Sequence, residues 1–310
     1  MQNKTGSSGR SEPDVRLLEK QQNLIGIGAL VIATLFFATQ DAITKFLVTD
    51  LPAPQIVAVR FFFFSIFAIL YASRKIGLAR AFQSAKKSLQ VVRGLLIVAE
   101  ITLFAAIIRY LGLAEMHTLF ACFPLIITML SGPFLGEKVG WRRWLAVVCG
   151  FLGTVIILRP GTGVFEPIAL AAIGVATMFA FYNILTRKLA KHDTFETSLL
   201  YFGVVGFVAS ALIAPFVWVP LGQLQWVGLG VVSFTAIVGH LLLIKALELA
   251  PAVILQPFNY FVLIWAIIIG YVLFDERLDW VSWLGSAIVV TSGIFIAYRE
   301  YRLLRTPEDN

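Results

Sequence analysis

Long apolar segments separated by short charged stretches run along nearly the whole chain. Ten segments carry this pattern, each about 18 to 25 residues long, the length that a helix needs to cross a hydrocarbon core of about 30 Å. They lie at residues 24–48, 54–73, 89–108, 114–135, 141–158, 167–185, 195–219, 224–244, 252–274 and 280–298. Strands of a membrane barrel would instead alternate apolar and polar residues. The pattern therefore predicts an all-α polytopic membrane protein with ten transmembrane helices.

The composition agrees with this pattern. Hydrophobic residues make up 59% of the 310 residues and charged residues 14%, against about 45–50% apolar and about 25% charged residues in a globular domain. A single soluble core stops growing near roughly 250–300 residues, so the apolar excess calls for a lipid bilayer as partner. The composition excludes a disordered chain and a disulfide scaffold, and it argues against a soluble enzyme and a nucleic-acid partner despite the formal net charge of +7.

Lysine and arginine gather on one side of the predicted spans. An even number of spans puts both termini on one side, which holds nineteen basic residues, whereas the other holds Arg109, Arg159 and Arg277. The nineteen are Lys4, Arg10, Arg16, Lys20, Arg74, Lys75, Arg80, Lys86, Lys87, Lys138, Arg142, Arg143, Arg187, Lys188, Lys191, Lys245, Arg299, Arg302 and Arg305. Because cytoplasmic loops carry the basic excess, we expect a multi-pass inner-membrane protein with cytoplasmic tails at 1–23 and 299–310, and no cleaved signal peptide.

The chain also repeats itself at offsets of 136 to 142 residues. Three matches occur in the same order in both halves: Ala38–Lys45 with Ala180–Arg187, Leu111–Ala114 with Leu247–Ala250, and Gly136-Glu137-Lys138 with Asp275-Glu276-Arg277. They predict two five-helix repeats at residues 24–158 and 167–298. Because five is odd, the second repeat enters the membrane from the opposite side, as in secondary transporters whose substrate site lies near the midplane.

These features resemble a known family. Gly-Glu-Lys followed by Trp-Leu and the pair Gly150/Gly153, the answering Asp-Glu-Arg followed by Trp-Leu and Gly285, and Arg60-Phe61 in the second span are similar to the EamA-type branch of the drug/metabolite transporter superfamily. The resemblance covers residues 24–298. It implies a secondary transporter of a small organic metabolite, and family members include amino-acid exporters, S-adenosylmethionine importers, riboflavin importers and drug efflux proteins.

Polar residues inside the spans are the candidates for substrate contact, because such groups are costly in lipid unless they face protein or water. Asp41 and Lys45 stand four residues apart, so they either neutralise each other, or Asp41 binds substrate together with Gln40. Glu100 lies mid-span without a basic helical neighbour, and it either has a cavity or proton-linked role or forms a structural pair with Arg60. Arg93 is interpreted as an interfacial anchor.

Two prolines, Pro124 and Pro257, interrupt the fourth and ninth spans at corresponding positions, which predicts bent helices that either gate access or are static. The substrate-binding candidates are Gln40, Asp41, Glu100, Tyr182, Asn183, Gln256, Asn259 and Tyr260, and the gating or structural candidates are Arg60, Pro124 and Pro257. His117 and His240 are interpreted as structural hydrogen-bonding residues. No metal and no cofactor is expected, because Cys122 and Cys149 lie in apolar spans without ligand spacing.

Small residues follow one stripe of the tenth span, and the fifth span carries Gly150 and Gly153. The stripe consists of Ser282, Gly285, Ser286, Val289, Ser292, Gly293 and Ile296. Small residues let helices approach closely. They serve packing inside the bundle or, alternatively, a homodimer through the fifth and tenth helices.

The charges near the predicted cavity almost balance, with Asp41 and Glu100 against Lys45 and Arg60. A neutral or zwitterionic ligand with a planar ring is therefore expected, and riboflavin fits this description best. S-adenosylmethionine, an amino acid or an exported drug or metabolite are the alternatives. A membrane-embedded lipid-modifying enzyme is the alternative outside transport, but it requires catalytic residues clustered at one face, so we expect that the chain is not an enzyme.

The first prediction concerns the orientation of the termini. Because of the basic asymmetry, reporter fusions at Asn23 and after Arg305 should both give a cytosolic signal. A reporter that is active only outside the cytoplasm serves as the control at each position. A signal from outside the cytoplasm at either position would contradict both the topology and the inverted repeat.

Overall fold

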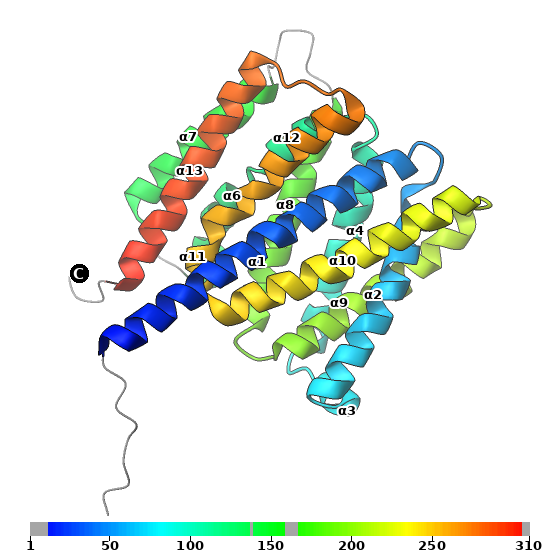
Figure 1. Cartoon of the computed structure of the whole chain (residues 1–310), viewed down its shortest axis with the longest axis horizontal. Helices are drawn as coiled ribbons and strands as arrows, with labels where there is room; N and C mark the ends of the chain where they lie inside the picture. The colour runs from blue at the N-terminus through cyan, green and yellow to red at the C-terminus, as the bar shows by residue number, and fades with distance from the viewer. Residues whose placement is uncertain (1–11, 137–138, 159–166, 306–310) are drawn as a thin grey trace, which may run out of the picture.

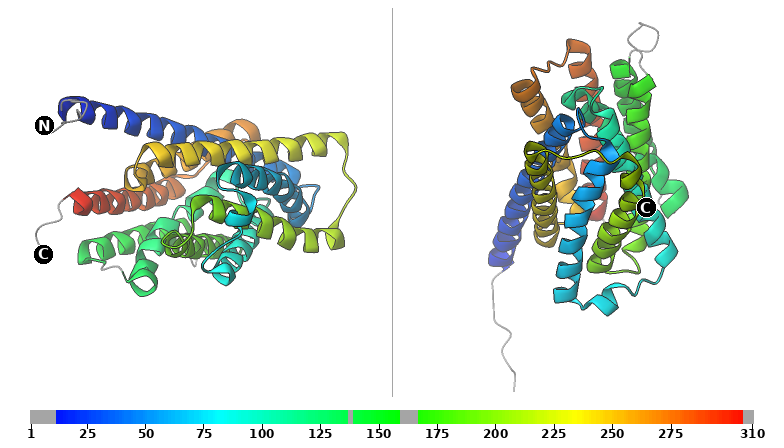
Figure 2. Two further views of the ribbon diagram at one scale, coloured as in Figure 1. Left: turned by 90° about the horizontal axis from the view of Figure 1, so that it is seen from below. Right: turned by 90° about the vertical axis from the view of Figure 1, so that its right-hand side faces the viewer.

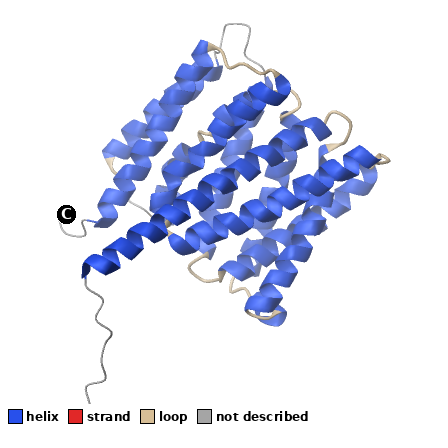
Figure 3. Ribbon diagram, in the orientation of Figure 1, coloured by secondary structure: helices blue, strands red, loops and turns tan. Residues whose placement is uncertain are grey.

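The computed structural model describes residues 12–136, 139–158 and 167–305. All regular structure within these residues is helical (Figure 3). Ten segments of this part of the chain are long and apolar enough to cross a membrane. This result confirms the predicted all-α fold with ten spans.

Eight of the spans are α1 (Glu12–Leu47), α2 (Ala53–Lys75), α4 (Lys87–Ile107), α7 (Trp141–Leu158), α8 (Pro167–Leu189), α9 (Phe195–Ile213) continued by η1 (Ala214–Val217), α10 (Gln223–Leu249) and α13 (Trp280–Arg305). The fourth span consists of α5 (Leu113–Phe120) and α6 (Phe123–Leu135), and the ninth of η2 (Gln256–Tyr260) and α12 (Phe261–Phe274), which α11 (Ala252–Leu255) precedes. The short helix α3 (Leu78–Ala81) lies in the connection between α2 and α4.

The fourth and ninth spans are interrupted at their prolines. Pro124 lies in the first turn of α6, directly after the break that separates this helix from α5. Pro257 lies in the first turn of the 3-10 helix η2. A proline has no N–H to donate and its ring clashes with the preceding turn. Both spans therefore change helical geometry at corresponding places, as the sequence predicts.

The main helix contacts of the first half have equivalents in the second half. α1 contacts α10 and α12, and its counterpart α8 contacts α4, α5 and α6. α2 contacts α10, and its counterpart α9 contacts α4. The two remaining large contacts, α2 with α9 and α7 with α13, each join counterparts. The largest contacts of the spans in one half are thus matched by contacts of their counterparts in the other.

The start of α1 and the end of α13 lie at the same end of the bundle (Figures 1 and 2). We call this end the terminal face, and we call the end with the α1–α2 and α12–α13 connections the opposite face. An even number of spans requires this arrangement. Which face is cytoplasmic stays a prediction.

Gln55 holds one connection at the opposite face. Its side chain is 0% exposed, its Nε2 donates to the Val219 carbonyl at 2.9 Å, and its Oε1 accepts from the Val219 N–H at 3.0 Å. The amide therefore replaces a backbone partner for the segment between η1 and α10.

Asp193 holds a connection at the terminal face. Its Oδ1 accepts from the Ala85 N–H at 3.0 Å, and its Oδ2 accepts from Gln90 Nε2 at 2.8 Å and from the Ser84 hydroxyl. Partial burial raises the pKa of Asp193, but the three hydrogen bonds and the nearby His192 together lower it by more. The pKa of Asp193 therefore lies below its ordinary value. The charged carboxylate thus joins the α2–α4 and α8–α9 connections.

The small residues of α7 and α13 pack against each other within one chain. A Cβ atom on Gly153 would lie 2.9 Å from the Gly285 carbonyl oxygen, and one on Gly285 would lie 2.7 Å from the Gly153 carbonyl oxygen. Only glycine permits this approach at both positions. Packing inside the bundle therefore uses these two glycines.

The second prediction concerns Gln55. Replacing Gln55 with alanine removes both hydrogen bonds to Val219, and the free energy of unfolding should fall by about 1–3 kcal/mol. Thermal unfolding of the detergent-purified protein measures the change. Gln83→Ala, at an exposed glutamine, is the matched control and should leave the transition unchanged. An equal effect of both substitutions would contradict the role of Gln55.

Candidate functional site

Three titratable side chains from three helices lie within electrostatic reach of one another inside the bundle. Asp41 lies on α1, Arg60 on α2 and Glu100 on α4, and the Arg60 guanidinium interacts electrostatically with both carboxyl groups. The Glu100 residue is only 4% exposed. Among the described residues no direct ion pair joins Arg60 to Glu100, which does not support the alternative of a structural pair, and the Arg60 guanidinium lies within electrostatic reach of both acids. We call these three residues the central cluster.

His117 on α5 extends the central cluster. Its Nε2 lies 3.2 Å from Asp41 Oδ2, a suitable distance for an ion pair when the ring is protonated. Neither ring nitrogen has a hydrogen-bond partner of good geometry, so the interpretation of His117 as a satisfied structural histidine is wrong. Gln40 Nε2 contacts Asp41 Oδ1 at 3.4 Å, a long hydrogen bond. The Asp41 carboxylate therefore contacts a histidine and an amide but no fixed cation.

His240 on α10 faces the same region with its ring packed among phenylalanines. Its Nδ1 lies 2.8 Å from the Ala236 carbonyl oxygen of its own helix, which confirms the expected structural hydrogen bond. The ring centroid lies 4.9 Å from that of Phe64 and 5.3 Å from that of Phe37. Aromatic rings therefore pack around His240, on the α10 side of the central cluster.

A small cavity lies between the two interrupted spans. Its volume is about 20 Å³, which is room for a single water. Its lining includes His117, Phe120, Pro124, Gln256, Asn259 and Tyr260. Drug-sized ligands occupy pockets of about 300–1,000 Å³. The structure therefore brings the predicted candidates of the ninth span together with Pro124, in a conformation too closed at this place to hold a metabolite.

Buried polar atoms without partners gather around this cavity. Three of the seven buried atoms without a hydrogen bond in the described part of the chain belong to residues that line it, the two ring nitrogens of His117 and the Tyr260 hydroxyl, although His117 Nε2 also lies 3.2 Å from Asp41 Oδ2. A fourth, Gln40 Oε1, lies on the neighbour of Asp41. Buried polar groups in native structures are rarely left without a partner. Atoms like these are the ones that a bound ligand or ordered water would satisfy.

Tyr182 and Asn183 lie apart from the cavity, on α8. Asn183 Nδ2 donates to the Phe179 carbonyl of its own helix at 2.8 Å, which leaves less of this amide for a ligand. The Tyr182 ring lies beside that of Phe179, with centroids 5.9 Å apart, and Phe179 in turn contacts Phe120 of the cavity lining. An aromatic path thus connects Tyr182 to the cavity.

Arg93 on α4 lies beneath the Tyr182 ring, with its Cζ 5.3 Å from the ring centroid. It is only 2% exposed, its Nη1 donates to Thr186 Oγ1 at 3.2 Å, and its Nη2 donates to the Ser198 carbonyl at 2.6 Å. The interpretation of Arg93 as an interfacial anchor is therefore wrong. A sequence signal was present, because Arg93 precedes Glu100 by seven residues, two helical turns, and so shares its face of α4.

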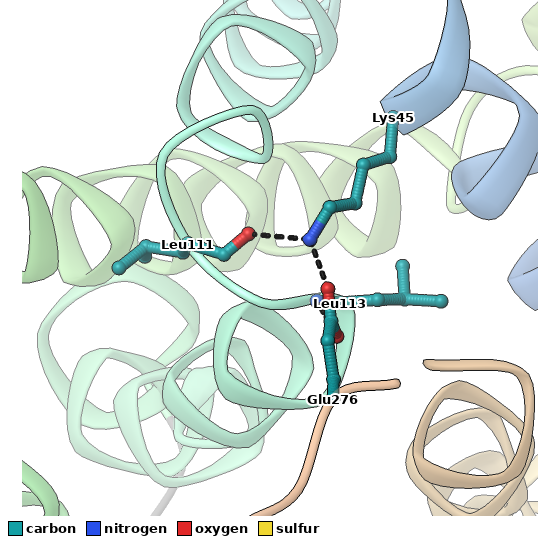
Figure 4. Close-up of polar contacts among 4 residues, drawn as sticks. All are labelled: Lys45, Leu111, Leu113 and Glu276. Atoms are coloured by element: carbon teal, nitrogen blue, oxygen red, sulfur yellow. Dashed lines mark hydrogen bonds and ion pairs between the residues drawn. The ribbon is translucent and has the colours of Figure 1, made fainter. Parts of the chain in front are cut away.

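Lys45 has a partner far along the chain instead of Asp41. Its Nζ forms an ion pair with Glu276 and donates to the Leu111 carbonyl at 3.0 Å (Figure 4). The other carboxylate oxygen of Glu276 accepts from the Leu113 N–H at 2.6 Å. These contacts join the end of α1 to the α4–α5 and α12–α13 connections at the opposite face. Of the two alternatives for Asp41 and Lys45, the one in which they neutralise each other is therefore wrong.

The residues of this ion-pair cluster all lie in segments that the two halves share. Lys45, the segment Leu111–Ala114 and Glu276 each belong to one of the three sequence matches between the halves. The matching residues Glu137 and Lys138 lie outside the described residues. The described part of the chain contains no group of three or more metal-ligating side chains.

The chain is similar in sequence to known transporters and in fold to a protein of known structure. The sequence pattern of the EamA-like transporter family matches residues 24–159 and again residues 167–298. An S-adenosylmethionine uptake transporter of Rickettsia conorii is 26% identical over 93% of this chain and 97% of its own length. A riboflavin transporter of Vibrio cholerae is 29% identical over 92% of this chain and 97% of its own length. A protein of known crystal structure shares the fold with a TM-score of 0.60 at 17% identity, covering 93% of this chain and 99% of that one.

The third prediction concerns the pair Lys45–Glu276. The two side chains are 15% and 17% exposed, so Lys45→Met or Glu276→Gln alone leaves a largely buried charge unpaired and should lower the free energy of unfolding by about 3 kcal/mol. The double variant should cost less than the sum of the two.

Thermal unfolding of all three variants measures this coupling. The exposed pair Lys245–Glu248, with side chains 59% and 53% exposed, is the matched control. Its variants Lys245→Met and Glu248→Gln should change stability by only about 0.5 kcal/mol. Additive effects at Lys45 and Glu276 would contradict the pair.

Proposed function

We propose that this chain, which belongs to the EamA-like transporter family, imports a small organic cation or zwitterion carrying a planar ring. One observation carries the substrate class: Lys45 is bound to Glu276, which leaves Asp41 and Glu100 to share Arg60 at the centre. Two carboxyl groups against one guanidinium complement a ligand with a cationic group. The sequence predicts balanced charges at the centre only if Lys45 is counted there. In the structure Lys45 lies at the opposite face, paired with Glu276.

S-adenosylmethionine is the ligand that we propose. Its sulfonium group matches the two carboxyl groups of the central cluster, and its adenine can stack on aromatic rings. Phe120, Phe179 and Tyr182 offer such rings in one continuous path. The relative in Rickettsia conorii that is named an S-adenosylmethionine uptake transporter supports both this substrate and the direction of transport.

Riboflavin is the second candidate. The relative in Vibrio cholerae that is named a riboflavin transporter favours it, as do the unpartnered His117 Nδ1 and Tyr260 hydroxyl beside the cavity. A neutral ring system with many hydrogen-bonding atoms would satisfy these groups. It would not use the acidic excess, so transport of riboflavin should not depend on the charge of Glu100.

Alternating access of two inverted repeats is the proposed mechanism, with repeats at residues 24–158 and 167–298. The pairing of helices that survives exchange of the halves supports it, and so do the interruptions at Pro124 and Pro257 in corresponding spans. The cavity between these interruptions must enlarge to admit a metabolite. We propose that segments α5, α6, η2 and α12 move to open it.

The transporter names of the relatives support transport instead of catalysis. The basic excess at the terminal face supports a cytoplasmic position for both tails. A homodimer through α7 and α13 would have to use faces other than the one where Gly153 and Gly285 meet.

The fourth prediction tests the substrate. Proteoliposomes containing the full chain should take up labelled S-adenosylmethionine, and riboflavin should compete only weakly. Glu100→Gln removes one of the two acids and should lower uptake roughly tenfold or more, the size expected for a lost charged contact. Thermal unfolding shows whether the variant is folded.

Glu248→Gln is the matched control, because this carboxylate is exposed, and it should transport normally. Uptake of riboflavin but not of S-adenosylmethionine, with Glu100→Gln still active, would overturn the charge argument and favour the second candidate. Normal S-adenosylmethionine uptake by Glu100→Gln would exclude the central cluster as its binding site.

A further inference from the structure

We infer that Gln90 and Arg93 form a subsite for the α-amino acid end of the transported metabolite, on the terminal-face side of the central cluster. This inference rests on the proposed function, because it assigns one end of the proposed ligand. The two residues lie three positions apart on α4 and are therefore neighbours on its surface.

The first observation is the burial of Arg93 without an anion. Its hydrogen bonds go to a hydroxyl and a backbone carbonyl, of Thr186 and Ser198, and its Nε has no partner. Among the described residues no carboxylate forms an ion pair with it. Burying a charge that lacks a counter-charge costs several kcal/mol. The guanidinium fork matches a carboxylate with two parallel hydrogen bonds.

The second observation is an unpartnered acceptor beside this unpartnered donor. Gln90 is 0% exposed, and its Nε2 donates to Asp193 Oδ2 at 2.8 Å and to Ser198 Oγ at 3.2 Å. These contacts fix the amide so that Oε1 is the oxygen, and Oε1 has no partner. An α-amino acid supplies the missing groups, since its carboxylate accepts from Arg93 Nε and its ammonium donates to Gln90 Oε1.

The third observation is the position of the pair along the path. Arg93 lies seven residues before Glu100 on α4, which places it about 10 Å closer to the terminal face. The Tyr182 ring covers its guanidinium. A ligand held by its sulfonium at the central cluster would therefore meet Gln90 and Arg93 with its amino acid end as it moves toward the terminal face, the face that we propose to be cytoplasmic.

The fifth prediction tests this subsite with two ligands that differ in one group. S-adenosylmethionine and its decarboxylated form share the adenine, the sulfonium and the amine, but only the first carries the carboxylate. In proteoliposomes the wild-type chain should transport S-adenosylmethionine with a KM at least tenfold lower. Arg93→Gln should abolish this preference by raising the KM of S-adenosylmethionine alone, and Arg93→Lys should retain part of it.

Thr186→Val is the matched control, because it removes a hydrogen bond of Arg93 but leaves the charge. It should keep the preference for the carboxylate. Equal loss of preference in Thr186→Val and Arg93→Gln would mean that Arg93 only holds helices together, and an unchanged preference in Arg93→Gln would overturn the subsite directly. If Arg93→Gln does not fold, Arg93→Lys decides between these outcomes.

A second measurement separates failure of the subsite from failure of the proposed substrate. Methionine at millimolar concentration should raise the unfolding temperature of the wild-type chain, methionine methyl ester should not, and Arg93→Lys should reduce the rise. No difference between acid and ester would overturn the subsite. An Arg93-dependent rise in a chain that does not transport S-adenosylmethionine would overturn only the proposed substrate.

Discussion

A charge inside this bundle is costly unless protein, ligand or enclosed water stabilises it, because lipid offers neither water nor counter-ions. The structure meets this requirement in two different ways. Lys45 has a dedicated partner, Glu276, with backbone groups of Leu111 and Leu113 completing the cluster. Asp41 and Glu100 instead share Arg60. The Lys45–Glu276 pair is saturated, whereas two carboxyl groups near a single guanidinium are the arrangement on which the proposed cation site rests.

The same requirement explains where unpartnered polar atoms are tolerated. Six of the seven in the described part of the chain belong to Gln40, His117 and Tyr260 near the cavity or to Gln90 and Arg93 on α4. A structural network would be expected to satisfy its own members, because an unpaired buried group costs about 1–3 kcal/mol. Their grouping along one path favours a site that a ligand completes, with the helix interruptions at its centre.

The spans could be predicted from the sequence because a hydrophobic length is a local property, and so could the interruptions, because proline acts on its own turn. The partners of the charged side chains could not be predicted in this way. The spacing of Asp41 and Lys45 permits a helical pair, but Lys45 binds a residue 231 positions away, and nothing in a single sequence reports that distance. The depth of Arg93 in its span fits an anchor, and although Arg93 shares a helix face with Glu100, only its partners on α8 and α9 decide its role.

The two halves share a scaffold but not its chemistry. Helix contacts are exchanged when the halves are exchanged, yet the charged members of the proposed path all lie in the first half. Asp41, for example, corresponds to the neutral Asn183 at an offset of 142 residues. A symmetric scaffold suits alternating access, because the two end states become similar in packing. Asymmetric side chains give a ligand with distinct ends one preferred orientation, so the scaffold can move symmetrically while the ligand is bound in a single direction.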